Sequence, residues 1–438
     1  MVVQSSACLL PQSPYTAPIF GSRAGVEEIP WINNRKRYKA MDTCNSPRFA
    51  VLGAGHGGTA MAGHLSLMGF DVSLYNRGED RLRPIKAAGG LEIITDIPTT
   101  IPHGFASIET VTSNAAEAIC GRDILMVVVP ATGHRYIAEQ IAPHLVDGQI
   151  VVLNPGRTGG ALEVYKVIRD HGCKADVVVA EAQTFIYASR SMNPAQTKIF
   201  RIKNSIPVAA LPAHRTPDVV NALRTAFPQF VPGDNVMKTS LDNIGAIFHP
   251  AVTVLNAARI ESTNGDFDYY TEGITPSISL ILEKMDKERV QVAEALGFRA
   301  MTAREWLYIA YDAAGRTLYE AMRANRGYDG IKAPKTVYHR YISEDIPMSL
   351  VPISSLGLQV KVPTPTIDAV ILLGSILHDV DYWSIGRTAE RLGLANKSLK
   401  QIRRFILEGE EEDSWHRQSS PVPSETASTL RESSDSSA

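Results

Sequence analysis

Apolar positions follow two different patterns along the chain. In the first half, short runs such as residues 49–52, 124–129 and 149–153 are apolar without alternation, which is typical of parallel strands buried on both faces. Between these runs, apolar residues recur at intervals of three and four, as they do on amphipathic helices. The pattern over residues 47–236 therefore predicts a doubly wound α/β domain with a mostly parallel sheet.

Further apolar runs predict the remaining strands of this domain. Residues 71–75 indicate a strand that follows the first helix. Residues 91–95 and 104–109 predict a hairpin, with two prolines between its strands. Residues 198–202 and 207–211 are close in the sequence and are expected to pair with each other.

The pattern changes after residue 236, where glycine becomes rarer and long helical periods dominate. This spacing predicts an all-α second domain over residues 237–408. The expected helices cover residues 241–258, 278–296, 303–322, 367–392 and 398–407.

The two ends of the chain show no such period. Residues 1–46 mix Ser, Pro and Gly with a basic cluster, and residues 409–438 are rich in Ser and acidic residues. Because segments of this composition bury little apolar surface, both ends are expected to be disordered. An organelle transit peptide is an open alternative for the first segment.

A glycine-rich turn follows the first predicted strand. Gly53, Gly55 and Gly58 have the spacing G-x-G-x-x-G, followed by a helical pattern and the strand at residues 71–75. In such a unit the first glycine allows a tight turn, the second admits a pyrophosphate, and the third lets the helix pack against the strand. We therefore expect a Rossmann domain whose helix N-terminus binds dinucleotide phosphates. A turn that binds no ligand would have the same spacing.

The end of the second strand bears on the choice between NAD and NADP. A carboxylate usually binds the ribose hydroxyl of NAD at this position, but the sequence has Asn76 and Arg77 there. A guanidinium suits a 2′-phosphate, which favours NADP and leaves NAD open. The alternative is that Arg77 stacks on adenine or points into solvent. The residues expected to bind the cofactor are Gly53, Ala54, Gly55, His56, Gly57, Gly58, Asn76, Arg77 and Pro130.

The composition excludes several classes of function. A net charge of −2 gives no electrostatic footprint for nucleic acid, and no apolar run is long enough to span a membrane. The four cysteines are scattered without a C-x-x-C pair. We therefore expect a cytoplasmic protein without a structural metal site.

Two residues of the second domain are candidates for chemistry. His249 lies in an apolar helical pattern directly before Pro250, and a proline there interrupts the helical hydrogen bonds and makes polar groups available to a ligand. A histidine at such a break suits general acid–base catalysis. Asp368 lies near the start of a later helix, and a carboxylate bonded to imidazole would fix its tautomer. A packed core histidine and a helix-capping aspartate explain these two residues at least as well.

Five segments carry a family resemblance. They are residues 51–58 (VLGAGHGG), 154–160 (NPGRTGG), 248–250 (FHP), 339–347 (HRYISEDIP) and 362–368 (VPTPTID). In this combination and order the chain resembles the octopine/nopaline (opine) dehydrogenase family, over about residues 47–408. The resemblance implies that NADH or NADPH reduces an imine formed from an amino acid and an α-keto acid. It also implies that His249 is the catalytic acid/base and Asp368 its partner.

Binding of two substrate carboxylates requires further donors. Arg340 is a candidate for bidentate carboxylate binding, and an ion pair with Glu344 or Asp345 is the alternative. Residues 130–133 and 154–160 follow sheet strands and are expected to line the nicotinamide end of the site. Asn154 is therefore a candidate substrate contact, and a plain βα turn is its alternative.

Rival functions remain open at this point. A reductase of a single keto substrate, of the glycerol-3-phosphate or ketopantoate reductase type, would use a lysine, and neither Lys238 nor Lys284 has a suitable helical setting. A non-catalytic NADP-binding sensor is a second rival. Helical second domains often bury one face in a dimer, so a homodimer is a further expectation.

Overall fold

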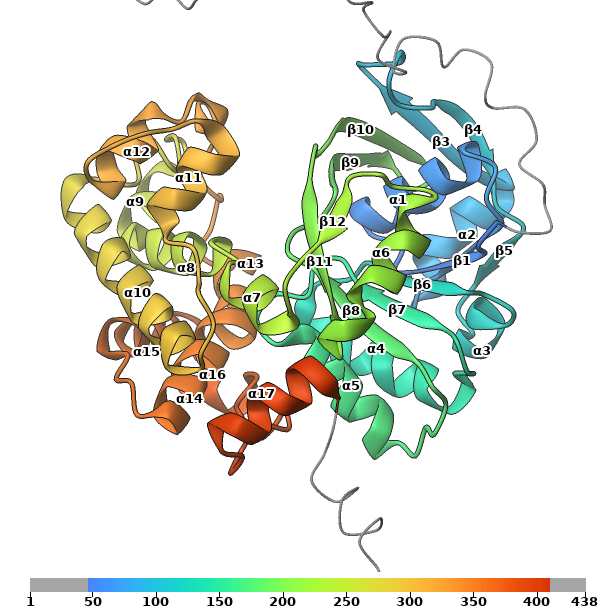
Figure 1. Cartoon of the computed structure of the whole chain (residues 1–438). Coiled ribbons are helices and arrows are strands. Elements are labelled where there is room, and N and C mark those ends of the chain that lie inside the picture. The colour runs from blue at the N-terminus through green and yellow to red at the C-terminus, as the bar shows by residue number, and fades with distance from the viewer. Residues whose placement is uncertain (1–45, 410–438) are drawn as a thin grey trace, which may run out of the picture. The chain divides into compact units, whose positions relative to one another are not determined.

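A mostly parallel sheet of eight strands forms the centre of the first half of the chain in the computed structural model (Figure 1). The structure describes residues 46–409, so the predictions for residues 1–46 and 409–438 lie outside it except at their inner boundaries. The strands lie in the order β12 (Phe230–Pro232), β11 (Ile206–Leu211), β8 (Val178–Ala182), β7 (Ile150–Leu153), β6 (Ile124–Val127), β1 (Phe49–Leu52), β2 (Val72–Tyr75) and β5 (Thr110–Thr112).

Strands β8 to β5 run parallel to one another, and β11 pairs antiparallel to β8. Successive residues of the central strands enter opposite apolar cores: Ala50 and Leu52 contribute to one, Phe49 and Val51 to the other. This two-sided burial explains the unbroken apolar runs and confirms the predicted doubly wound sheet.

Helices cover both faces of this sheet (Figure 1). One face packs against α3 (Ala115–Ile119), α4 (His134–Ile141) and α5 (Gly160–Asp170). The other packs against α1 (His56–Leu67), α2 (Glu79–Ala88) and α6 (Thr216–Arg224).

A second sheet of four strands packs on α1. Its order is β4 (Gly104–Ser107), β3 (Gly90–Thr95), β10 (Gln196–Ile202) and β9 (Tyr187–Asn193). The predicted hairpin of β3 and β4 is confirmed. The predicted pairing of residues 198–202 with 207–211 is wrong, because β10 pairs with β9 and β3, whereas β11 belongs to the main sheet. The prediction paired these two segments because they are close in the sequence. It also did not include β9 as a strand.

The second half of the described chain is helical, as predicted (Figure 1). Its helices are α7 (Val236–Leu241), α8 (Gly245–Leu255), α9 (Ala257–Thr263), α10 (Pro276–Ala295), α11 (Ala303–Tyr311), α12 (Leu318–Ala324), α13 (Arg340–Ser343), α14 (Val351–Val360), α15 (Pro365–His378), α16 (Tyr382–Ile385) and α17 (Leu399–Glu408). Within residues 46–409, no helix combines the length and the apolar character needed to cross a bilayer.

Several predicted helices are divided in the structure. The segment 303–322 breaks at Asp312, which adopts a left-handed conformation with φ of 54° and ends α11. The segment 241–258 breaks near residues 242–244 and again at Asn256, whereas Pro250 lies inside α8. Helix α14 was not predicted. Apolar periodicity alone does not show such breaks, because the apolar spacing continues across them.

One of the two apolar cores joins the sheet to the helices of the second half. The core on the α5 side of the sheet continues without interruption through α7 and α8 to α15 and α17. The predicted boundary at residues 236/237 falls in the first turn of α7. Residues of both halves can therefore contribute to one site.

Candidate active site

The glycine turn between β1 and α1 has the geometry of a phosphate-binding turn. Gly53 has a φ of 126°, and a Cβ atom on Gly58 would lie 1.6 Å from the Gly53 carbonyl oxygen. These two positions therefore require glycine. A Cβ atom on Gly55 would meet nothing within 4 Å. The open space beside Gly55, next to the N-terminus of α1, fits a pyrophosphate.

The end of β2 supports this turn with an amide side chain. The Asn76 Oδ1 atom accepts a hydrogen bond of 3.2 Å from the Ala54 backbone N–H, and its Nδ2 atom donates to the Gly78 carbonyl. Arg77 is exposed, and its guanidinium lies 5.3 Å from the centre of the Tyr136 ring. A cation and an aromatic ring therefore lie together where the adenosine part of a dinucleotide would bind. Pro130 is exposed just after β6, at the carboxyl ends of the parallel strands.

His249 lies on α8 between three polar side chains. Its Nδ1 atom is 2.9 Å from the Asp345 Oδ2 atom, and its Nε2 atom is 3.2 Å from the Tyr270 hydroxyl. Tyr341 stacks on the imidazole with ring centres 4.2 Å apart. The Tyr269 hydroxyl donates to the His249 carbonyl oxygen at 2.8 Å. The side chain is 19% exposed, so its ring position is fixed while one edge stays accessible.

The partner of His249 is a buried carboxylate that also pairs with an arginine from the first half of the chain. The Arg157 Nη1 atom lies 2.8 Å from Asp345 Oδ1, and the Arg157 Nε atom lies 3.4 Å from Glu344 Oε1. Burial alone would raise the pKa of Asp345, but Arg157 and His249 hold it below its ordinary value of 3.8. Asp345 is therefore ionised near neutral pH and can stabilise an imidazolium.

The predicted pairing of His249 with Asp368 is wrong in this structure. Asp368 lies in the first turn of α15 and accepts a hydrogen bond of 2.5 Å from the Ser354 hydroxyl, with the Thr364 hydroxyl also nearby. Its carboxylate therefore links the start of α15 to α14. Both aspartates lie in segments that carry the family resemblance, and sequence alone gave no distance by which to choose between them.

Arg340 and Asn154 have different surroundings. Arg340 is exposed and forms an ion pair of 3.0 Å with Glu344, which leaves other N–H groups of its guanidinium available. Asn154 is buried, and its Nδ2 atom donates to the Val152 carbonyl at 2.9 Å. This hydrogen bond stabilises the turn that follows β7. A substrate contact by Asn154 stays a prediction.

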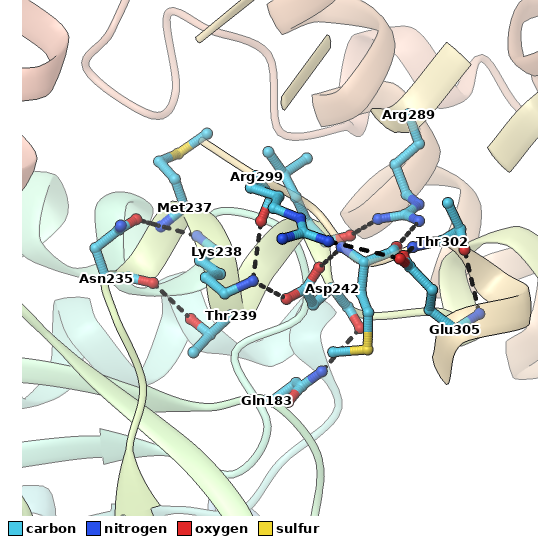
Figure 2. Close-up of polar contacts among 12 residues, drawn as sticks. Gln183, Asn235, Met237, Lys238, Thr239, Asp242, Arg289, Arg299, Thr302 and Glu305 are labelled. Carbon is cyan, nitrogen blue, oxygen red and sulfur yellow. Dashed lines mark hydrogen bonds and ion pairs between the residues drawn. The ribbon is translucent and has the colours of Figure 1, made fainter. Parts of the chain in front are cut away.

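The lysine on α7 is engaged in a structural contact (Figure 2). The Lys238 ammonium bonds to the Asp242 carboxylate at 2.8 Å and to the Arg299 carbonyl at 2.9 Å. The other Asp242 oxygen accepts from the Met301 backbone N–H. Lys238 therefore fixes the segment between α7 and α8 and is not available for chemistry.

A buried arginine after α16 joins the last part of the chain to the loops beside the site. The Arg387 Nε atom is 2.6 Å from Glu163, and its guanidinium also donates to the carbonyls of Gly156, Thr158 and Ala131. These carbonyls belong to the loops that follow β6 and β7. Arg387 thus fixes both loops from the C-terminal side of the chain.

Three residues near His249 were missed by sequence reasoning as contributors to its chemistry. Arg157 and Asp345 lie inside the segments NPGRTGG and HRYISEDIP, so the motifs contained the signal without the assignment. Tyr270 belongs to no recognised pattern. Its contact with His249 arises only from the packing of residues 269–270 against α8.

Comparison with known proteins identifies both halves of the chain. Residues 232–378 match a family described as NAD/NADP octopine/nopaline dehydrogenase, alpha-helical domain. Residues 48–159 match the N-terminus of NAD-dependent glycerol-3-phosphate dehydrogenase. An opine dehydrogenase of Arthrobacter sp. (strain 1C) is 40% identical over 361 residues, which is 82% of this chain and 99% of the relative.

Solved structures show the same fold. A structure of octopine dehydrogenase with NADH and agmatine aligns with a TM-score of 0.70 at 20% identity, covering 84% of this chain and 99% of the other. A yersinopine dehydrogenase with bound NADP+ aligns with a TM-score of 0.65 at 16% identity, covering 86% of this chain and all of the other. These structures share a dinucleotide-binding sheet and a helical second part with this chain.

Proposed function

This chain belongs to the opine (octopine/nopaline) dehydrogenase family, and from that premise we propose how its residues join an amino acid to an α-keto acid. As a member, it is an NAD(P)-dependent oxidoreductase. The finer assignment is that it acts on a CH–NH group, by reducing the imine of the two substrates. The observation that carries this proposal is the His249–Asp345 pair, which lies beside an arginine that reaches it from the cofactor-binding half.

The glycine turn fits the cofactor. Gly53 to Gly58 and Asn76 would hold the pyrophosphate and the adjacent ribose, because the space beside Gly55 is open and the α1 N-terminus faces it. Arg77 suits a 2′-phosphate, so we propose a preference for NADP over NAD. When bound, the reduced nicotinamide supplies hydride to the imine carbon.

His249 carries the protons in this proposal. Asp345 binds Nδ1, so Nε2 is the atom that exchanges protons with the substrates. Nε2 takes a proton from the substrate ammonium, and the free amine then attacks the keto carbon to form a carbon–nitrogen bond. The attacking nitrogen passes one proton to the keto oxygen, which becomes a hydroxyl group. The imidazolium then gives its proton to this hydroxyl, which leaves as water and yields the protonated imine. Asp345 stabilises the imidazolium between these steps.

Arg340 would bind one substrate carboxylate through its free N–H groups while Glu344 fixes its orientation. The substrates are thus small molecules with an amine, a ketone and two carboxylates. A cytoplasmic location, predicted from the cysteine pattern, and a homodimer belong to the same proposal.

The test is NADPH oxidation by the purified protein against a panel of amino acids and α-keto acids, supplied singly and in pairs, with NADH in parallel. Oxidation that requires a pair and is lost in His249→Ala is the expected result. Arg77→Ala should raise the Kd for NADPH and leave that for NADH unchanged. Oxidation with a keto substrate alone would favour the single-substrate reductase, and tight NADPH binding without turnover would favour the sensor.

A further inference from the structure

Lys203 is a half-buried cation without a carboxylate partner. It follows β10, and its ammonium donates to the Thr184 hydroxyl at 2.6 Å. Among the residues that the structure describes, no acidic side chain forms an ion pair with it. Burial, with a smaller effect from the Arg157 guanidinium, lowers the pKa of Lys203 to about 8. A half-buried ammonium without a counter-ion is partly desolvated, and a bound anion would offset that cost.

Lys203 bonds to the loop after β8, and this loop lies between the glycine turn and the connection from α7 to α8. A Cβ atom on Gly57 would lie 2.7 Å from the Phe185 ring, so this loop touches the glycine turn. On its other side, the Gln183 Nε2 atom donates to the Asp242 carbonyl at 2.9 Å (Figure 2). The Lys203 backbone N–H donates to the Ile186 carbonyl and ties β10 to the same loop.

A second unused donor lies directly after Asp242. The Asn243 Nδ2 atom is buried and has no hydrogen-bond partner within the described part of the chain. The surroundings of Gly245 show which groups lie near this amide. A Cβ atom built on Gly245 would be 3.2 Å from His249 Cε1, 3.3 Å from Arg157 Nη1 and 3.3 Å from Asn243 Oδ1. Asn243 is therefore beside the acid/base pair, and its free N–H group needs an acceptor.

The charges around His249 leave one cation in excess. Arg157 pairs with Glu344 and Asp345, and Arg340 pairs with Glu344. Two arginines thus balance two carboxylates. Lys203 lies close enough to Arg157 for that guanidinium to lower its pKa, and it adds a positive charge that no described side chain neutralises. The site therefore attracts an anion on the Lys203 side.

We propose that Lys203 and Asn243 form a carboxylate-binding subsite, which holds the substrate carboxylate that Arg340 does not. The inference rests on the proposed function, because only a reaction that joins two carboxylic acids needs two such subsites. Arg340 begins α13 and Lys203 follows β10, so the joined substrates would be held by residues from both halves of the chain. The carboxylate belongs to either the keto acid or the amino acid, and kinetics distinguishes the two.

The experiment compares Lys203→Gln, Lys203→Arg and Asn243→Ala with a matched control, Lys198→Gln. Lys198 lies on β10, the strand that precedes Lys203, and pairs with Asp96 at 2.8 Å. Because a charge-assisted hydrogen bond is lost, Lys203→Gln should raise the KM of one carboxylate substrate by about 10- to 100-fold. The KM of the other substrate and of NADPH should stay unchanged, and Lys203→Arg should restore part of the loss. The substrate whose KM rises is the one bound here.

A binding measurement separates this inference from the proposed function. Iminodiacetate is a secondary amine with two carboxylates, and calorimetry should show weaker binding to Lys203→Gln than to wild type and Lys198→Gln. If no substrate pair is turned over but this difference persists, the proposed function fails and the subsite stands. Equal iminodiacetate affinity in wild type and Lys203→Gln, an unchanged KM for both substrates, or an increase confined to the KM of NADPH would each overturn the subsite.

Discussion

The imidazole of His249 meets a different group at each ring nitrogen, and this asymmetry decides which nitrogen can exchange a proton. Asp345 is fully buried and fixed by Arg157, so it holds Nδ1 permanently. The Tyr270 hydroxyl at Nε2 is a neutral partner that a substrate can displace. In the proposed mechanism, these two contacts leave Nε2 as the ring nitrogen that exchanges a proton with the substrates.

Replacement of Asp345 by Asn should distinguish the His249–Asp345 pair from the predicted His249–Asp368 pair. Asn keeps the shape but loses the charge that stabilises the imidazolium, so kcat should fall by about 100- to 10,000-fold. Asp368→Asn, the matched variant, should keep kcat close to wild type because its carboxylate bonds to Ser354.

Thermal melting and NADPH titration are the controls for both variants, since Asp345→Asn also leaves Arg157 buried with one partner fewer. A loss of kcat in Asp368→Asn as large as that in Asp345→Asn would support the predicted pairing of His249 with Asp368 instead. The comparison uses initial rates at a temperature where each variant is folded.

At the scale of elements, the β1–α1–β2 unit positions the cofactor turn by close backbone approach. Gly53 and Gly58 touch each other across the turn, whereas Gly55 faces open space. The same spacing therefore serves two purposes, packing at its two ends and ligand access in its middle.

Alanine at Gly58 should impair folding, whereas alanine at Gly55 should impair NADPH binding. Gly58→Ala forces a clash with the Gly53 carbonyl and should prevent accumulation of folded protein. Gly55→Ala should melt near the wild-type temperature and raise the Kd for NADPH by more than about tenfold, because the methyl group fills the phosphate space. Wild-type NADPH affinity in Gly55→Ala would show that the phosphates bind elsewhere.

Elements whose partners are set by buried apolar runs could be predicted from sequence, and elements set by long-range packing could not. The strands at 49–52 and 149–153 were predicted because burial on both faces leaves a continuous apolar run. The predicted partner of β10 is wrong because β11 is its neighbour in the sequence, whereas β3 lies about a hundred residues earlier. In the candidate site, the motif predicts His249 but does not pair it with Asp345, because only the fold brings α8 next to residues 344–345.

At the scale of the whole molecule, pH acts on stability through a buried histidine of α1. His64 lies on α1, is 4% exposed, and bonds to the Tyr187 hydroxyl at 2.8 Å. Burial lowers its pKa from 6.5 to about 4. In the unfolded chain His64 takes up a proton near pH 6.5, whereas the folded protein stays unprotonated there until about pH 4.

The free energy of unfolding should therefore fall as pH decreases from about 6.5 to about 4, by about 3 kcal/mol from this residue. Below that range both states are protonated and the contribution stays constant. Denaturant unfolding of wild type and His64→Gln across this range isolates the effect, because the other titrating groups are shared. Parallel stability curves for the two proteins would refute it.

The contact of Arg387 with Glu163 spans 224 residues and sets an order of events during synthesis. At about 5 to 20 residues per second, the ribosome adds Arg387 roughly 10 to 45 s after Glu163. Throughout that interval the emerging nucleotide-binding half carries an acidic side chain that is destined for burial and has no counter-ion, and the loops after β6 and β7 lack their common donor. We expect nascent chains stalled before residue 387 to be cleaved by protease at these loops, and chains released after it to resist. The loops after β6 and β7 thus obtain their common donor only when a much later part of the chain has been made.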